Sequence, residues 1–63
     1  MANNYRRMRR RADMEAADAA KRLGVSPNTI TNWESGKTSP TAEKLVKMAE
    51  LYGCKVDELL ALV

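Results

Sequence analysis

The side chains best suited to recognising another molecule gather between residues 26 and 38 of this 63-residue chain. Asn28 and Asn32 each carry an amide, which places a hydrogen-bond donor beside an acceptor, and Thr31 carries a hydroxyl and a methyl group. Such an amide can bond N6 and N7 of adenine together, and a threonine methyl can contact the methyl of thymine. The alternative is a solvated polar face, but asparagine and threonine are only middling helix formers, so their clustering favours recognition.

Catalytic and metal chemistry lack their usual residues in this sequence. There is no histidine, and Cys54 is the single cysteine. Metal sites and histidine-activated nucleophiles therefore lose their common components, and the carboxylates are scattered over predicted helix surfaces. No intrachain disulfide can form, and we expect Cys54 to be a partly buried small apolar residue rather than a redox sensor. The sequence thus predicts no enzymatic activity, no metal and no cofactor.

Positive charge is concentrated in the first two thirds of the chain. Eight Lys and Arg residues face four Asp and Glu residues in 1–40, a net charge of +4, whereas residues 41–63 carry −1. This asymmetry suits a polyanion bound on one side of the molecule. No run is long and apolar enough for a membrane span or a signal peptide, so we expect a cytoplasmic protein that does not enter a membrane.

The elements that must position these residues are helices. Apolar residues recur at helical spacing and period-2 alternation is absent, which predicts an all-α fold. Gly24, Gly36 and Gly53 are expected to end helices, and Ser26 and Thr41 to cap the helices that follow. A chain of this length makes one domain, covering residues 1–63. We predict a compact fold of five short helices, over residues 4–12, 15–23, 27–34, 42–52 and 56–62.

One helix boundary is ambiguous. Residues 4–23 contain neither glycine nor proline, so propensity alone would allow one continuous helix. Asp13 is the only local signal for a break, as a capping residue. A straight helix would leave Met14 and one apolar face without a partner, so we expect two helices that separate near Asp13.

The predicted helices 15–23 and 27–34 are suited to a helix-turn-helix. Alanines on the inner face of the first let the second approach closely, and Gly24 lies in the short turn between them. Val25, Ile30 and Trp33 are expected to face inward. The opposite face of the second helix then presents its polar residues to the exterior.

This segment, AAKRLGVSPNTITNWESGKTSP, resembles the helix-turn-helix of the lambda-repressor and Cro-like DNA-binding proteins. The likeness extends over nearly the whole chain, from YRRMR to EKLVKMAELYGCKVDELL, and its most specific part is Gly24-Val25-Ser26 followed by Ile30, Trp33, Glu34, Gly36 and Pro40. It implies a five-helix lambda-repressor-like domain with the helix-turn-helix at about residues 15–34. The helix over 27–34 would then enter the major groove of double-stranded DNA, as in that family.

The resemblance also implies roles for individual residues. Base contacts are expected from Pro27, Asn28, Thr31 and Asn32. Phosphate contacts are expected from Ser26, Thr29, Ser35, Lys37, Thr38, Arg6 and Arg10. Arg7 and Arg11 share the outward face of the first helix with Arg6 and Arg10, where the alternative is a merely solvated charged surface. Arg9 is expected to form a structural ion pair with Glu34 that joins the first and third helices.

The sequence departs from the family pattern at the start of the second helix. Glu15 and Ala16 stand where relatives usually have threonine or serine followed by a glutamine that commonly touches DNA. We therefore expect that contact to be missing, and a carboxylate facing phosphate to be unfavourable. Lys55 stands where relatives have a serine cap for the last helix, and lysine caps poorly.

Taken together, these features predict a sequence-specific, double-stranded DNA-binding transcriptional regulator that acts as a repressor. A homodimer is expected through the apolar C-terminal residues Leu59, Leu62 and Val63, the alternative being a frayed terminus. One rival function is an antitoxin or another protein-partner-binding module of the same fold, with the C-terminal apolar surface as its interface. Another is a nonspecific nucleic-acid or RNA binder that depends on the arginines.

Overall fold

Five helices and no strand make up residues 3–61, the part of the chain that the computed structural model describes. They are α1 (Tyr5–Arg11), α2 (Ala16–Leu23), α3 (Pro27–Ser35), α4 (Ala42–Tyr52) and α5 (Val56–Leu59). The all-α fold of five helices is therefore confirmed. The predicted boundaries agree to within one residue except for α5, which ends at Leu59 rather than at residue 62.

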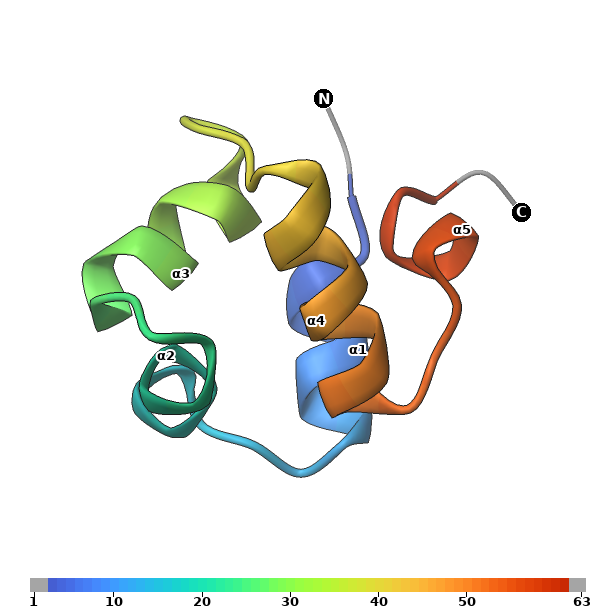
Figure 1. Cartoon of the computed structure of the whole chain (residues 1–63), viewed down its shortest axis with the longest axis horizontal. Coiled ribbons are helices and arrows are strands. Elements are labelled where there is room, and N and C mark those ends of the chain that lie inside the picture. The colour runs from blue at the N-terminus through green and yellow to red at the C-terminus, as the bar shows by residue number, and fades with distance from the viewer. Residues whose placement is uncertain (1–2, 62–63) are drawn as a thin grey trace.

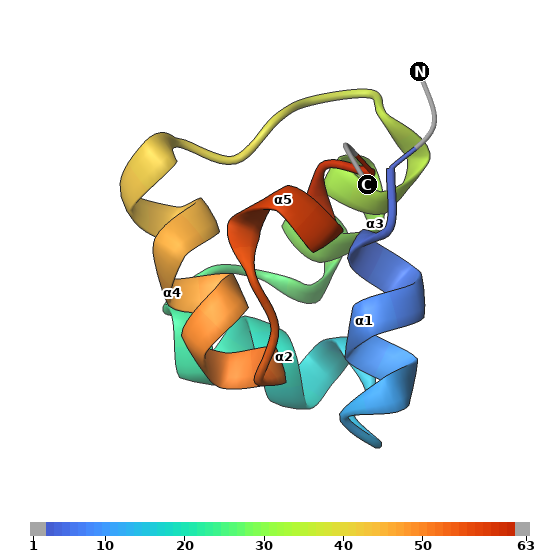
Figure 2. The same cartoon turned by 90° about the vertical axis from the view of Figure 1, so that its right-hand side faces the viewer.

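The helices are arranged so that α2 and α3 form one side of the molecule and α5 the other, with α1 and α4 between them (Figure 1). The second helix packs on α3 and α4, and α1 contacts α3, α4 and α5. Turning the molecule by 90° shows the short α5 lying over α1 and α4 (Figure 2). This arrangement leaves the far side of α3 open to solvent.

Every helix contributes to the core. Its largest fully buried side chains are Ile30, Met48 and Leu59, from three different helices. Ile30 and Trp33 face inward as expected, and the half-buried Val25 packs against the same cluster. The expectation that Leu59 lies at a dimer interface is wrong, because its exposed fraction is 0% and it completes the core between α5, α1 and α4. Leu62 and Val63 lie outside the described residues.

Local capping chemistry sets where α3 and α4 begin. Ser26 Oγ accepts a hydrogen bond from the Thr29 N–H at 3.2 Å, and Thr41 Oγ1 accepts one from the Lys44 N–H at 3.2 Å. Each bond satisfies a first-turn amide that has no partner within its own helix. Lys55 offers no acceptor to α5; instead, Glu58 Oε1 accepts from the Lys55 N–H at 2.9 Å.

The chain does break between α1 and α2, but Asp13 does not act as a cap. Asp13 has φ 59°, in the left-handed region, and its N–H donates to Arg10 O at 2.9 Å. Glu15 occupies the N-cap position of α2 and makes no side-chain capping bond. Aspartate tolerates a left-handed backbone better than most residues, so Asp13 turns the chain rather than capping the next helix. Met14 is half-buried against the core, in line with the burial reason for the break.

No helix within residues 3–61 is long and apolar enough to cross a membrane.

Candidate nucleic-acid interface

Two hydrogen bonds and the left-handed backbone of Gly24 fix the turn between α2 and α3. The Val25 N–H donates to Ala20 O at 2.9 Å, and Gly24 takes φ 71°, which a side chain would strain. From α4, Lys44 Nζ donates to Leu23 O at 2.8 Å, so a cation also lies at the negative end of the α2 dipole. Because Ala19 and Ala20 are fully buried, α2 and α3 approach closely, and the orientation of α3 is well defined.

The outward face of α3 carries the residues expected to contact bases. Pro27, Asn28 and Thr31 are exposed, whereas Asn32 is only half-exposed. The Thr31 hydroxyl donates to Pro27 O at 3.2 Å, which occupies its proton and leaves its oxygen able to accept. Among residues 3–61, no side chain or backbone group forms a hydrogen bond with the side-chain amide of Asn28. Asn28 is therefore the most available of the four for an external partner.

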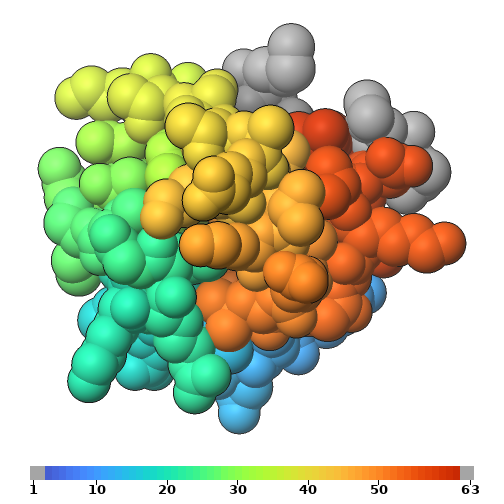
Figure 3. Space-filling model, in the orientation of Figure 1, coloured from blue at the N-terminus to red at the C-terminus, as the bar shows by residue number. Residues whose placement is uncertain are grey.

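The loop that follows α3 turns back onto the end of that helix. The N–H groups of Lys37 and Thr38 donate to Asn32 O at 2.9 and 3.3 Å, and Ser35 Oγ donates to the same carbonyl at 3.1 Å. The side chains of Ser35, Lys37 and Thr38 remain exposed. Figure 3 shows this loop, in yellow, forming a continuous surface with α3, in green. The loop thus presents a cation and two hydroxyls beside the outward face of α3.

Two of the expected phosphate contacts already have local roles. Ser26 Oγ caps α3 and lies 3.0 Å from Thr29 Oγ1. Ser26 is exposed and Thr29 is half-buried, at the first turn of α3. Their hydroxyls retain acceptor capacity, and the positive end of the α3 dipole lies at the same place.

The arginines of α1 differ in how they are engaged. Arg6, Arg7, Arg10 and Arg11 are all exposed. Arg6 Nε lies 3.3 Å from Glu34 Oε1, and Arg11 Nη1 lies 3.6 Å from Glu58 Oε2. Within the described part of the chain, Arg7 and Arg10 have no ion-pair partner. Arg10 is therefore more available to an external anion than Arg6.

Arg9 is built into the protein rather than presented to solvent. Its Nε lies 2.7 Å from Glu34 Oε2 and its Nη2 lies 3.1 Å from Glu34 Oε1, the bidentate pairing expected from the sequence. Its Nη1 donates to Met14 O at 2.8 Å. The hydrogen bonds to Glu34 raise the pKa of Arg9 above its ordinary value, against the opposing effect of burial. Arg9 therefore ties α1, the segment before α2 and the end of α3 together.

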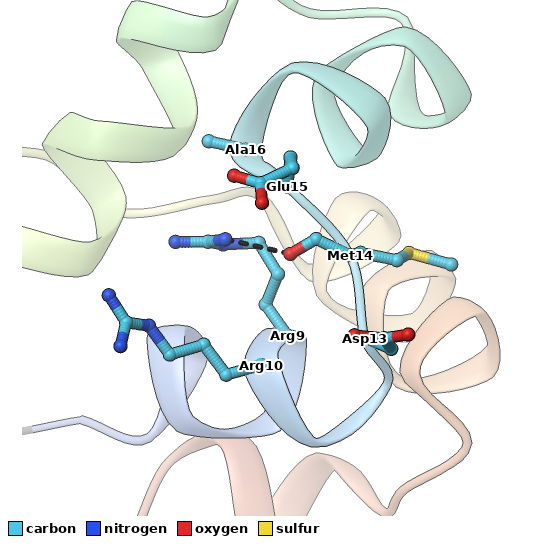
Figure 4. Close-up of a pocket in the computed structure, with 6 residues that line it drawn as sticks. All are labelled: Arg9, Arg10, Asp13, Met14, Glu15 and Ala16. Carbon is cyan, nitrogen blue, oxygen red and sulfur yellow. Dashed lines mark hydrogen bonds between the residues drawn. The ribbon is translucent and has the colours of Figure 1, made fainter.

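A hollow of about 400 Å³ lies between the end of α1 and the start of α2. Figure 4 shows that Arg9, Arg10, Glu15 and Ala16 line it, with Arg9 bonded to the Met14 carbonyl. Glu15 is exposed at its edge, so a carboxylate stands near the two arginines. Within residues 3–61, no three His, Cys, Asp or Glu side chains come together in a metal-binding group.

Three bonds from a side chain to a distant backbone carbonyl were not predicted from the sequence, and two of them hold α3 or the turn before it. Asn3 Nδ2 donates to Trp33 O at 3.1 Å, Asn4 Nδ2 donates to Glu58 O at 3.0 Å, and Lys44 Nζ donates to Leu23 O. Each links segments that are more than 20 residues apart in the chain. A carbonyl acceptor carries no residue-type signal, so spacing and composition could not have revealed these bonds.

Comparison with known proteins adds to this geometry. Residues 6–59 match a family model described as helix-turn-helix. A helix-turn-helix-type transcriptional regulator of Methanocaldococcus jannaschii is 34% identical over 59 residues, which cover 94% of this chain and 89% of that protein. The cryptic phage CTXphi transcriptional repressor RstR of Vibrio cholerae is 32% identical over 60 residues, covering 95% of this chain and 54% of the repressor.

A second phage protein, repressor protein C2 of Salmonella phage P22, is 32% identical over 60 residues. The match covers 95% of this chain but only 28% of that repressor. The chain therefore spans most of the archaeal relative, about half of the cholera phage repressor and about a quarter of the Salmonella phage repressor.

Proposed function

The chain belongs to the helix-turn-helix family of the lambda-repressor and Cro-like type, and from that membership we propose that it is a sequence-specific, double-stranded DNA-binding transcriptional repressor. The observation that carries the proposal is the outward face of α3, where Pro27, Asn28 and Thr31 are all exposed to solvent. No catalytic step and no cofactor form part of this function.

In the proposed complex, α3 enters the major groove and Asn28 reads a base edge through its side-chain amide. Thr31 offers its methyl group and a hydroxyl oxygen to the neighbouring base. Lys37, Thr38 and Arg10 contact phosphates on either side of the groove, which sets the register of α3 without reading sequence. Because Asn32 is half-buried and its carbonyl holds the following loop, we assign it a smaller share of base recognition.

We further propose that the repressor binds as a homodimer and reads two half-sites about one helical turn apart. Leu59 is in the core, so the half-buried Leu60 together with Leu62 and Val63 would provide the interface. Sedimentation at micromolar concentration should show a dimer, and monomer alone at that concentration would contradict this part of the proposal. The proposed place of action is the cytoplasm, where microbial DNA lies.

The decisive experiment is selection of bound duplexes from a random pool, followed by competition between the selected duplex and a random duplex at fixed salt. A specific regulator binds its selected site about 10³-fold or more tightly than random DNA. Equal affinity for all duplexes would instead support the nonspecific binder. A stoichiometric protein partner recovered by pull-down, without duplex preference, would support the partner-binding module.

A further inference from the structure

Asn3 lies before the residues that match the family and is not one of the residues expected to contact DNA. Resting on the proposed function, we propose that Asn3 is a positioning residue for DNA binding: its side-chain amide holds the end of α3 and the loop that carries Lys37 and Thr38.

Both ends of the Asn3 amide are engaged. Its Oδ1 accepts from the Tyr5 N–H at 3.0 Å, and its Nδ2 donates to Trp33 O at 3.1 Å. The first bond joins Asn3 to the first turn of α1, where Tyr5 is buried, and the second reaches the last turn of α3. Because an amide has a donor and an acceptor on opposite branches, one side chain bridges the two helices.

The carbonyls of Trp33 and Asn32 accept the hydrogen bonds that hold the loop after α3. Trp33 O accepts from the Gly36 N–H at 3.1 Å, while Asn32 O accepts from the N–H groups of Lys37 and Thr38. These bonds form the end of α3, where Gly36 has φ 82°. Asn3 therefore holds the peptide group next to the one that orders the proposed phosphate-contacting residues.

Asn3 also lies beside this loop in space. It lines a hollow of about 180 Å³ together with Trp33, Gly36 and Thr38. Glu34, the residue after Trp33, also attaches α3 to α1, because its side chain pairs with that of Arg9. Asn3 adds a second attachment through the backbone, and two attachments restrain the rotation of the helix end that one would allow.

Asn4 provides a matched control. It is the neighbouring residue of the same type, and its Nδ2 donates to the carbonyl of Glu58 at 3.0 Å, so it holds α5 instead of α3. Asn3→Ala and Asn4→Ala each remove one side-chain bond to a helix-end carbonyl and leave the net charge unchanged, and Asn3→Ala also removes the side-chain acceptor of the Tyr5 N–H within its own segment. A merely structural role would make the two variants alike.

The test measures affinity for the selected duplex at several salt concentrations. Asn3→Ala should bind about 3- to 10-fold more weakly than the parent protein, the scale of one hydrogen bond, and the slope of log K against log salt should fall by up to about 1. Asn4→Ala should keep the slope and affinity of the parent. An Asn3→Ala protein with unchanged affinity and slope, or an Asn4→Ala protein with the same loss, would overturn the proposal.

Two further measurements keep the outcome clear. In a Lys37→Ala background, Asn3→Ala should have little additional effect on binding, because it acts through the loop; full additivity would overturn the proposal. In the protein without DNA, Asn3→Ala should make the Lys37 and Thr38 amides exchange about 5- to 10-fold faster, and unchanged exchange would contradict the role. If the parent protein itself prefers no duplex, the repressor function fails, whereas a specific parent with an unaltered Asn3→Ala variant defeats this inference alone.

Discussion

Arg9 and Glu34 join α1 to α3 through two parallel hydrogen bonds, with both side chains almost fully removed from solvent: the Arg9 side chain is 9% exposed and the Glu34 side chain 3%. The Glu34 carboxylate also accepts a bond from Arg6, so three N–H groups surround its two oxygens. Because this ion pair is buried, its loss should change the position of α3 more than it changes the charge of the protein surface.

Removing one partner of this pair should destabilise the protein severely. A buried charge left without its partner costs about 3–5 kcal/mol, which is comparable with the whole stability of a domain this small. The milder changes Arg9→Lys and Glu34→Gln should each cost about 1.5–3 kcal/mol of unfolding free energy. A double-mutant cycle by urea unfolding should give a coupling of about 1 kcal/mol or more, and independent effects would contradict the pairing.

Two variants, Asn28→Ala and Lys37→Ala, should distinguish the recognition of bases from the binding of phosphates. Asn28→Ala should lower affinity for the selected duplex by about 1–3 kcal/mol and relax preference at one base position, because the bidentate amide contact is lost. Lys37→Ala should weaken binding to all duplexes alike and reduce the salt slope by about 1. Competition binding against single-position duplex variants measures both. An Asn28→Ala protein that keeps the parental base preference would show that Asn28 does not read a base.

Glu15 should oppose DNA binding. It stands exposed at the start of α2, among the residues that line the hollow with Arg9 and Arg10. Glu15→Gln removes a negative charge near the proposed phosphate path, so affinity for every duplex should rise by about 3- to 10-fold at low salt and less at high salt.

Glu43→Gln is the control for the loss of charge alone. Glu43 is exposed on α4, pairs with Lys47 at 3.8 Å and is not one of the residues expected to contact DNA. This variant should change affinity little. If both variants bind more tightly to the same degree, the effect comes from net charge and not from the position of Glu15.

Tyr52 should make the protein less stable in alkali. Its side chain is buried, and the loss of hydration raises its pKa from 10 to about 12. Between these values the unfolded chain loses the phenolic proton that the folded protein keeps, so the free energy of unfolding falls as pH rises, by about 2–3 kcal/mol at most. Urea unfolding from about pH 9 to pH 12 measures this slope.

Tyr52→Phe separates this effect from the titration of other groups. The Tyr52 hydroxyl has no hydrogen-bond partner among the described residues, so its removal at neutral pH should be neutral or stabilising by up to about 1 kcal/mol. The alkaline slope should become shallower, with a remainder from Tyr5, whose pKa burial also raises. An identical slope in both proteins would show that Tyr52 titrates without linkage to folding.

The sequence by itself determined the helices and the outward face of α3. Signals such as Gly24, Ser26-Pro27 and Thr41 act within one helical turn, so they need no knowledge of the rest of the fold. Helical periodicity likewise separates Ile30 and Trp33 from Asn28 and Thr31, because these two sets point in opposite directions on one helix. The family pattern added the partner of Arg9.

Only the tertiary structure decided which of several equivalent residues would be buried and which backbone groups would be bonded. The short α5 is followed by further apolar residues, so periodicity could not choose between Leu59, which is in the core, and Leu60, which is half-exposed. The bonds from Asn3, Asn4 and Lys44 end on carbonyl groups, which every residue carries. Such contacts depend on where distant helices come to lie, and that follows from packing the whole chain rather than from any local run of residues.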